Sequence, residues 1–267
     1  MILQKVSQLI ARKKKAQEWG IEFNRVKDFQ IPQFLKLEGQ EIEINLPASE
    51  PGMLAEFVEI ILDDCYQLKS WKKKLDPEVK ILDIGGNVGL FSLAARQFFP
   101  QAIIHAYEPN SSLEKYLSHQ AKIANFDYSL QALGARDGQM RLQLSEKGSS
   151  CNTVSIVDEE GDIPMVALSK AIDNLGGHVD LVKCDCEGAE WELFEASNVW
   201  DKVDNITMEY HLYQKKHTLE KLKQTMTRLG FNIKYLQPTN QYYGNLCLLY
   251  TSPSPRDLST SRMPSSA

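Results

Sequence analysis

The chain has 267 residues, of which 43% are hydrophobic and 24% are charged, so it holds enough apolar side chains for one large or two small folded domains. This composition excludes disorder over the whole chain. The formal net charge of −5 provides no overall positive field, which argues against an extended nucleic-acid contact and favours a small-molecule acceptor.

The cysteines and the hydropathy pattern bear on location. Five cysteines, an odd number with no CxxC spacing, favour a reducing, cytoplasmic compartment over a disulfide scaffold. Cys184 and Cys186 lie two residues apart and are interpreted as buried thiols, so no metal site is expected. The sequence has no run of about 18 apolar residues, so no transmembrane segment is expected.

Residues 1–50 are expected to form an N-terminal helical and extended segment. The first fifteen residues read MILQKVSQLIARKKK, with apolar residues at helical spacing followed by a basic run. A signal peptide places its charges before its apolar stretch, so this order indicates an amphipathic helix instead. We expect the helix to pack on the domain, and weak contact with a membrane surface is the alternative.

Residues 51–246 are expected to form one domain in which strands alternate with helices. Strands are expected at 79–84, 102–107, 128–133, 140–144, 179–184, 206–210, 231–236 and 244–249, and helices at 88–99, 111–124, 189–197 and 218–229. This alternation predicts an α/β fold with a parallel sheet covered by helices on both faces. In such a sheet ligands bind beyond the carboxyl ends of the strands, so residues at those ends are the candidate site residues.

The first of these strands ends in DIGGNVG, residues 83–89, directly before a helix. Its glycines allow a tight turn and a close backbone approach to a ligand, although a glycine turn is also an ordinary way to leave a strand. The order differs from the G-x-G-x-x-G of dinucleotide-binding proteins, because an acid precedes the glycines. That acid would repel a pyrophosphate and suit a cationic amino group. The candidate cofactor contacts are Asp83, Gly85, Gly86, Asn87 and Gly89.

The second strand ends in AYEPN, which places Glu108 25 residues after Asp83, where an acid can accept hydrogen bonds from both hydroxyls of a ribose. One acid for an amine and one for a ribose suit S-adenosylmethionine (SAM) better than NAD. The motif D-x-G-x-N-x-G followed by E-P-N resembles the core of class I methyltransferases. The resemblance implies a Rossmann-like fold, a mostly parallel seven-stranded sheet and SAM as the cofactor.

Three further motifs narrow the resemblance: ALGARDG at 132–138, DCEGAE at 185–190 and MEYH at 208–211. Together they resemble the FkbM-type methyltransferases, SAM-dependent enzymes that commonly methylate hydroxyl groups. The resemblance covers roughly residues 50–246 and departs at Cys186, where the family usually has an aliphatic residue. It implies an O-methyltransferase whose acceptor is a hydroxyl of a sugar, glycan or natural product.

The acids of DCEGAE are expected to face the cleft. Asp185 and Glu187 alternate with Cys184 and Cys186, so an extended chain points the acids to one side and the thiols to the other. There the two acids can position an acceptor hydroxyl, and Asp185 can also contact the cofactor. Glu190 lies one turn into the next helix, where the positive helix N-terminus alone could favour it.

The motif MEYH supplies the candidate base. A hydroxyl acceptor must lose its proton during or just after methyl transfer. Glu209 and His211 share one face at a strand end, and an imidazole titrates near neutral pH. A single histidine is often structural, so the assignment of His211 depends on its place at the strand end, two residues from an acid.

Two other function classes share parts of this pattern. A dinucleotide-dependent oxidoreductase would use the same sheet, but the acid at Asp83 argues against it. A non-catalytic glycan-binding module would need neither Glu108 nor the glycine turn. The sequence carries no signature of oligomeric state.

Residues 247–267, CLLYTSPSPRDLSTSRMPSSA, differ in composition from the rest of the chain. They resemble the translation of a sequencing adapter, so we expect a non-native tail. A disordered Ser/Pro-rich tail is the alternative.

Overall fold

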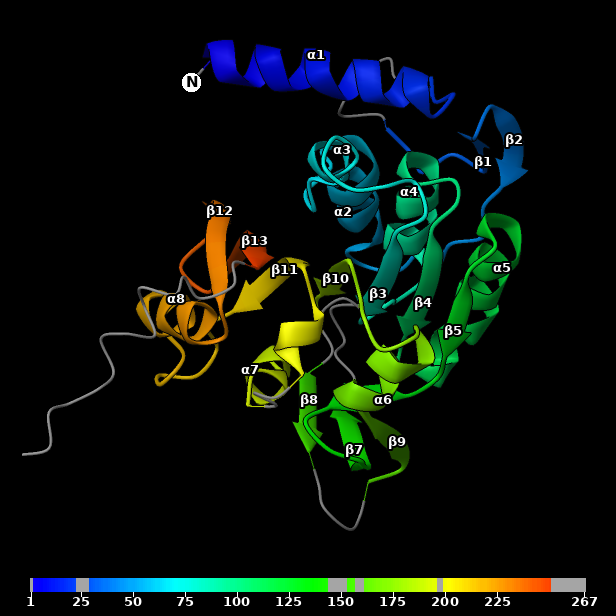
Figure 1. The fold of residues 1–267 in the computed structure, drawn as a ribbon. Helices are drawn as coiled ribbons and strands as arrows, with labels where there is room; N and C mark the ends of the chain where they lie inside the picture. The colour runs from blue at the N-terminus through cyan, green and yellow to red at the C-terminus, as the bar shows by residue number, and fades with distance from the viewer. Residues whose placement is uncertain (1, 23–28, 144–152, 157–160, 196–198, 251–267) are drawn as a thin grey trace, which may run out of the picture.

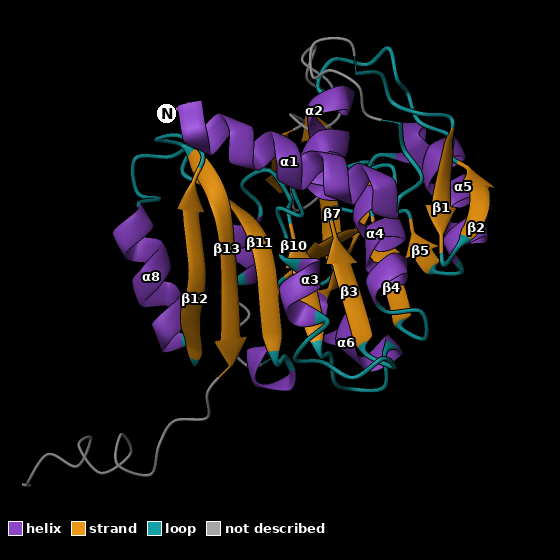
Figure 2. Cartoon of the chain, turned by 90° about the horizontal axis from the view of Figure 1, so that it is seen from above, coloured by secondary structure: helices purple, strands orange, loops and turns teal. Residues whose placement is uncertain are grey.

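The computed structural model describes residues 2–22, 29–143, 153–156, 161–195 and 199–250. A seven-stranded sheet forms its centre, with the strands side by side in the order β12–β13–β11–β10–β3–β4–β5 (Figure 2). These strands are β3 (Lys80–Ile84), β4 (Ile103–Tyr107), β5 (Asp127–Ser129), β10 (Leu181–Cys184), β11 (Asn205–His211), β12 (Phe231–Pro238) and β13 (Tyr243–Tyr250).

The sheet is mostly parallel, as predicted. Only β13 runs antiparallel to its neighbours, β11 and β12. The chain order reverses beside β3, because β4 and β5 follow on one side while β10 and β11 lie on the other. A ligand site is expected at such a reversal, beyond the carboxyl ends Ile84 and Cys184.

Helices cover both faces of the sheet (Figure 1). One face carries α2 (Met53–Phe57), the π-helix η2 (Val58–Leu62), α3 (Leu68–Trp71), α4 (Leu90–Phe98), η3 (Ser111–Leu113) and α5 (Glu114–Ala124), and the other carries α6 (Leu168–Asn174), α7 (Glu190–Leu193), η5 (Trp200–Lys202) and α8 (Leu219–Arg228). Strand side chains alternate between these layers, so Ile81 packs in the first core and Leu82 in the second. The four helices predicted in this region are present, with α7 shorter than expected.

The N-terminal segment shares its core with the first of these faces. Helix α1 (Ile2–Glu18) leads into Trp19, which is buried in the same cluster as Phe57. Arg12 donates two hydrogen bonds to Asp63, at 2.6 and 2.5 Å. The predicted packing of this helix on the domain is confirmed. The segment also holds the hairpin β1 (Phe34–Leu37) and β2 (Gln40–Glu43).

A second, four-stranded sheet lies between β5 and α6. Its strands are β6 (Ala132–Gly134), β7 (Gly138–Gln143), β8 (Thr153–Ile156) and β9 (Ile163–Ala167), in the order β6–β9–β7–β8. The single strand expected at 128–133 is wrong, because the chain changes sheets between Ser129 and Ala132. Strands β8 and β9 were not predicted.

The last strand bears on the expected tail. Strand β13 runs through to Tyr250 and pairs with β11 and β12, with Cys247 and Leu248 buried. The strand expected at 244–249 is confirmed and crosses Cys247, where the non-native tail is expected to begin. The origin of residues 247–267 stays a prediction. Residues 251–267 lie outside the described residues. Within the described part of the chain, no helix is long and apolar enough to cross a membrane.

Candidate active site

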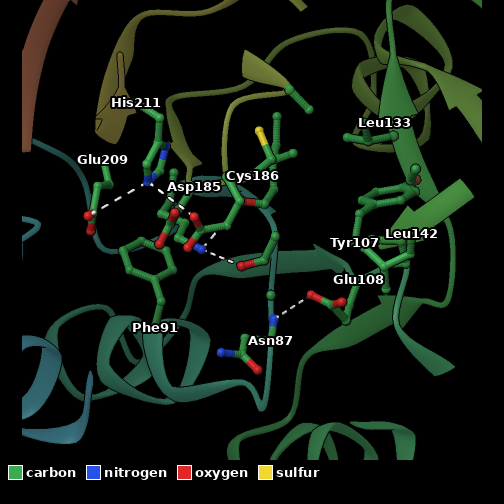
Figure 3. Close-up of a pocket in the computed structure, with 18 of the residues that line it drawn as sticks. Asn87, Phe91, Tyr107, Glu108, Leu133, Leu142, Asp185, Cys186, Glu209 and His211 are labelled. Atoms are coloured by element: carbon green, nitrogen blue, oxygen red, sulfur yellow. Dashed lines mark hydrogen bonds and ion pairs between the residues drawn. The ribbon is translucent and has the colours of Figure 1, made fainter. Parts of the chain in front are cut away.

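A cavity of about 280 Å³ opens where the strand order reverses. The carboxyl ends of β3, β4, β10 and β11 form its floor, and α2, η2 and the four-stranded sheet supply further walls. Glu108 and Asn87 lie toward one end, and His211, Glu209 and Asp185 lie toward the other (Figure 3). We refer to these regions as the Glu108 end and the His211 end.

The glycine turn after β3 ties three strand ends together. Gly85 has φ +75°, and a Cβ there would lie 1.8 Å from the carbonyl oxygen of Asp185, so only glycine allows these two strand ends to pack. The amides of Gly85 and Gly86 both donate to the carbonyl of Tyr107, at 2.9 and 3.0 Å. The turn therefore has a packing role besides lining the cavity with Gly85, Gly86 and Asn87.

Gly89, the last residue of the motif, does not line the cavity. It precedes α4 with φ +85°, and a Cβ there would lie 3.1 Å from side-chain atoms of Gln120 and Phe126. The predicted cofactor contact of Gly89 is not supported, because this glycine serves the packing of α4 on α5.

Glu108 is held in place by the backbone. Its Oε2 accepts a hydrogen bond from the amide of Asn87 and its Oε1 one from the amide of Asn110, both at 2.8 Å. Burial raises the pKa of Glu108 to about 7, although these two hydrogen bonds counteract the rise. Each carboxylate oxygen keeps a further lone pair for a ligand hydroxyl. The geometry thus matches the predicted ribose contact.

Asp83 lies beneath the cavity instead of lining it. Its side chain is fully buried, accepts a hydrogen bond from Ser92 at 2.7 Å and pairs with Lys183 at 3.2 Å. The cation that faces Asp83 in this structure is a lysine of the protein, so its predicted contact with a cationic ligand group has no support from the geometry.

Lys183 is a site residue that the sequence interpretation missed. It is 3% exposed, and its Nζ donates to the carbonyls of Ile84 and Gly85 besides pairing with Asp83. Burial lowers the pKa of Lys183, but the charges of Asp83 and Asp185 outweigh this effect and raise it. Lys183 thus remains charged and holds the glycine turn against β10.

Glu56, on α2, was also missed. Its two carboxylate oxygens accept from the side-chain amide of Asn87 at 3.0 and 2.9 Å, and it lines the cavity. Burial, followed by the charge of Asp185, raises the pKa of Glu56 to about 8. A cationic ligand group beside Asn87 would relieve both effects.

The predicted acids and histidine do meet at the His211 end. Ring nitrogen Nε2 of His211 lies 3.5 Å from Glu187 Oε2 and 3.8 Å from Glu209 Oε1. Asp185 completes the group, and the thiols of Cys184 and Cys186 lie together, 3.6 Å apart. The two thiols lie together and the two acids line the cavity as predicted, but Cys186 lines the cavity as well, because the strand ends at Cys184 and Glu187 has φ +51°.

Glu190 orients His211 and is fully buried. Its Oε1 accepts from the backbone amide of His211 at 2.8 Å and lies 3.2 Å from the ring Nδ1, while Oε2 accepts from the amide of Gly188 at 2.8 Å. The stabilisation of a carboxylate by the positive N-terminus of α7 would not by itself account for these contacts with His211. The pattern directs Nε2 of His211 toward the other carboxylates.

Burial and the mutual repulsion of the carboxylates shift the pKa values at the His211 end. Burial and the charge of Asp185 raise the pKa of Glu187 to about 8 and that of Glu209 to about 9. Burial lowers the pKa of His211, but the charge and hydrogen bond of Glu190 outweigh it, so the value rises to about 10. In this state His211 holds its proton at neutral pH, which weighs against its predicted role as the base.

The region of the chain that forms this site resembles known proteins. Residues 83–233, more than half of the chain, match the methyltransferase FkbM domain. The chain belongs to the FkbM methyltransferase family. It is therefore a SAM-dependent methyltransferase, and neither a dinucleotide-dependent oxidoreductase nor a non-catalytic module. Its fold is the Rossmann-like class I fold, with the seven-stranded sheet described above.

Relatives of this FkbM family member include two proteins that are named as methyltransferases. Methyltransferase 1 of Beauveria bassiana (strain ARSEF 2860) is 27% identical over 214 residues, which cover 68% of this chain and 83% of the relative. Methyltransferase sdnD of Sordaria araneosa is 26% identical over 196 residues, covering 58% and 74%. Among solved structures, the fibrillarin pre-rRNA processing protein of Methanococcus jannaschii aligns with a TM-score of 0.47 at 13% identity, over 86% of each chain.

The residues at the Glu108 end of this FkbM methyltransferase fit SAM. The backbone-held carboxylate of Glu108 suits a ribose, and Tyr107, Leu113 and Leu133 add ring and aliphatic surface for a base. Glu56 offers a buried carboxyl group that a cationic amino group beside it would favour in its ionised form. These residues of the chain are therefore suited to bind SAM, the cofactor of the family.

Proposed function

We propose that this methyltransferase methylates a hydroxyl group of a sugar, a glycan or a natural product. The observation that carries the proposal is the group of Asp185, Glu187, Glu209 and His211 at the end of the cavity away from Glu108. Carboxylates at a strand end can accept hydrogen bonds from acceptor hydroxyls and hold one of them in line for transfer. The protein also needs a group there that takes the hydroxyl proton.

SAM, when bound, supplies an electrophilic methyl group on its sulfonium sulfur. Asp185 and Glu187 position the acceptor, and Glu209 takes the proton as the acceptor oxygen forms its new bond to carbon. Because burial raises the pKa of Glu209 to about 9, only its ionised form can take this proton, so the rate of transfer should rise with pH above neutral. Lys183 and Glu190 act as positioning residues behind these groups.

The direct test is transfer from SAM that carries a tritiated methyl group to a panel of hydroxyl, amino, thiol and carboxyl acceptors. The expected product is a methyl ether that survives alkaline treatment. Label found only on nitrogen or sulfur, or in alkali-labile methyl esters, would contradict O-methylation of a hydroxyl while leaving the family assignment intact.

Within the cofactor site, we assign Glu56 to the amino group of the amino-acid portion. Glu56→Gln is expected to weaken binding of S-adenosylhomocysteine roughly ten- to a hundredfold, because a charge-assisted hydrogen bond is lost. Binding of 5′-methylthioadenosine, which lacks the amino-acid portion, should be unchanged. Calorimetric titration of both ligands measures this. Glu108→Gln is the matched comparison and should weaken both; an equal loss of both with Glu56→Gln would contradict the assignment.

Glu108 predicts a pH dependence of nucleoside binding. Its pKa of about 7 means that the carboxylate, the better acceptor for ribose hydroxyls, dominates at pH 8 and is largely protonated at pH 6. Affinity for 5′-methylthioadenosine should therefore fall about tenfold from pH 8 to pH 6. Because this ligand lacks the amino-acid portion, ionisation of Glu56 should not affect its binding. Glu108→Gln should bind weakly and equally at both pH values, and a slope that persists in this variant would assign the dependence to another group.

A further inference from the structure

We propose that Asp185, Glu187 and His211 bind a divalent cation of the Mn²⁺ class at the His211 end of the cavity. The proposal rests on the proposed function and deepens it, since the cation would lie where an acceptor hydroxyl loses its proton. One oxygen from each carboxylate and one ring nitrogen lie within 4.8 Å of one another. Around a bound ion, adjacent ligand atoms are about 3 Å apart and opposite ones about 4 Å, so small side-chain movements close the site.

A second layer of hydrogen bonds holds all three ligands. Tyr66 donates to Asp185 Oδ2 at 2.7 Å, and Tyr213 donates to Glu187 Oε2 at 3.1 Å. The Glu187 oxygen that Tyr213 fixes is also the one that faces His211 Nε2 at 3.5 Å, and a carboxylate oxygen with one hydrogen bond keeps a lone pair for an ion. Metal ligands in proteins are usually fixed by such outer partners.

His211 has the geometry of a metal ligand. It is 1% exposed, and its Nδ1 faces the buried carboxylate of Glu190 at 3.2 Å. A carboxylate at one ring nitrogen fixes the tautomer that presents the other nitrogen's lone pair to a metal. The other ring nitrogen, Nε2, faces the carboxylates of Glu187 and Glu209 at 3.5 and 3.8 Å. A metal ion would replace the proton on Nε2.

The balance of charge also favours a cation. Three carboxylates face the His211 end and Glu190 lies directly behind, against the single imidazole of His211. The ammonium of Lys183 is already used by Asp83 and two carbonyls. Uncompensated buried carboxylates are costly, and a divalent ion would offset that cost. Mixed imidazole and carboxylate ligands suit Mn²⁺ and its neighbours.

The ion would act as a Lewis acid on the acceptor. Coordination of the acceptor oxygen lowers the pKa of its hydroxyl. The O–H bond then breaks with the proton passing to Glu209, while the new O–C bond forms and the C–S bond breaks with its electron pair left on sulfur. Glu209 is not needed as a ligand and stays free for the proton.

Binding of Mn²⁺ alone tests the site without any acceptor. The full chain, freed of metal by chelation, is titrated with Mn²⁺ and free ion is followed by electron paramagnetic resonance. We expect one ion per chain, and at least tenfold weaker binding in Asp185→Asn, Glu187→Gln and His211→Ala. Thermal melts identify any variant that fails to fold. Because Glu187 is only half-buried, Glu187→Gln should leave the core intact.

The chain offers a matched control. His178, Asp180 and Asp204 form a second cluster of one histidine and two carboxylates, but it is more exposed, with His178 44% exposed. His178→Ala should leave Mn²⁺ binding unchanged. Loss of binding in His178→Ala, or no binding to the unaltered chain, overturns the proposal.

The proposed function fails in a different way. If the methyl label is transferred to hydroxyl acceptors in the presence of a chelator, with no Mn²⁺ bound, the proposed cation is contradicted and O-methylation is supported. If Glu187→Gln abolishes the binding of one Mn²⁺ per chain while the methyl label is found on nitrogen alone, the cation site is supported and O-methylation of a hydroxyl is contradicted.

Discussion

Asp83→Asn is expected to lower the free energy of unfolding by about 3 to 5 kcal/mol, because it leaves the ammonium of Lys183 buried without its carboxylate. Both side chains are nearly inaccessible, at 0% and 4%, and their backbones are direct partners across β3 and β10. Solvent therefore cannot compensate for the lost charge. Chemical denaturation followed by circular dichroism measures the change.

Two comparisons make this result specific. The double variant Asp83→Asn/Lys183→Met removes both charges and should be less destabilised than Asp83→Asn alone. Asp127→Asn changes an exposed aspartate of the same sheet and should stay within about 0.5 kcal/mol of the unaltered protein. If Asp83→Asn behaved like Asp127→Asn, the ion pair would not be what holds the two strand ends.

The sequence predicts the central sheet well because its buried strands are short apolar runs that end in Gly, Asn or acids. It does not show which sheet a strand joins. The apolar pattern continues from Tyr128 to Leu133, yet β5 pairs with β4 while β6 pairs with β9, about thirty residues further along the chain. Hydrophobic periodicity contains no information about such partners.

The same reason limits prediction of the site. Motifs at strand ends identify Glu108, Asp185, Glu209 and His211, because strand ends meet at one edge of a parallel sheet. The partner of Asp83 is 100 residues away, and only the register that sets Lys183 opposite it shows that this acid is not free for a ligand. Glu56 reaches the cavity from a helix that precedes every motif.

Glu209→Gln is expected to lower kcat by roughly a hundred- to ten-thousandfold if this carboxylate takes the proton of the acceptor. The amide keeps the size of the side chain but cannot act as a base, so affinity for S-adenosylhomocysteine should not change. Glu195→Gln, at an exposed position near α7, is the control and should leave kcat and affinity unaltered. Single-turnover methyl transfer separates the chemical step from product release.

The result of Glu209→Gln also distinguishes a base from a group that only positions the acceptor. Loss of a positioning hydrogen bond should raise KM for the acceptor along with any fall in kcat, as we expect for Asp185→Asn and Glu187→Gln. Loss of a base should appear in kcat with acceptor KM nearly constant. Glu209 lies 3.8 Å from His211 and is part-exposed to the cavity, so both outcomes are compatible with a folded variant. A normal single-turnover rate for Glu209→Gln would remove it as the base and return that role to His211, whose proton would then have to leave before transfer.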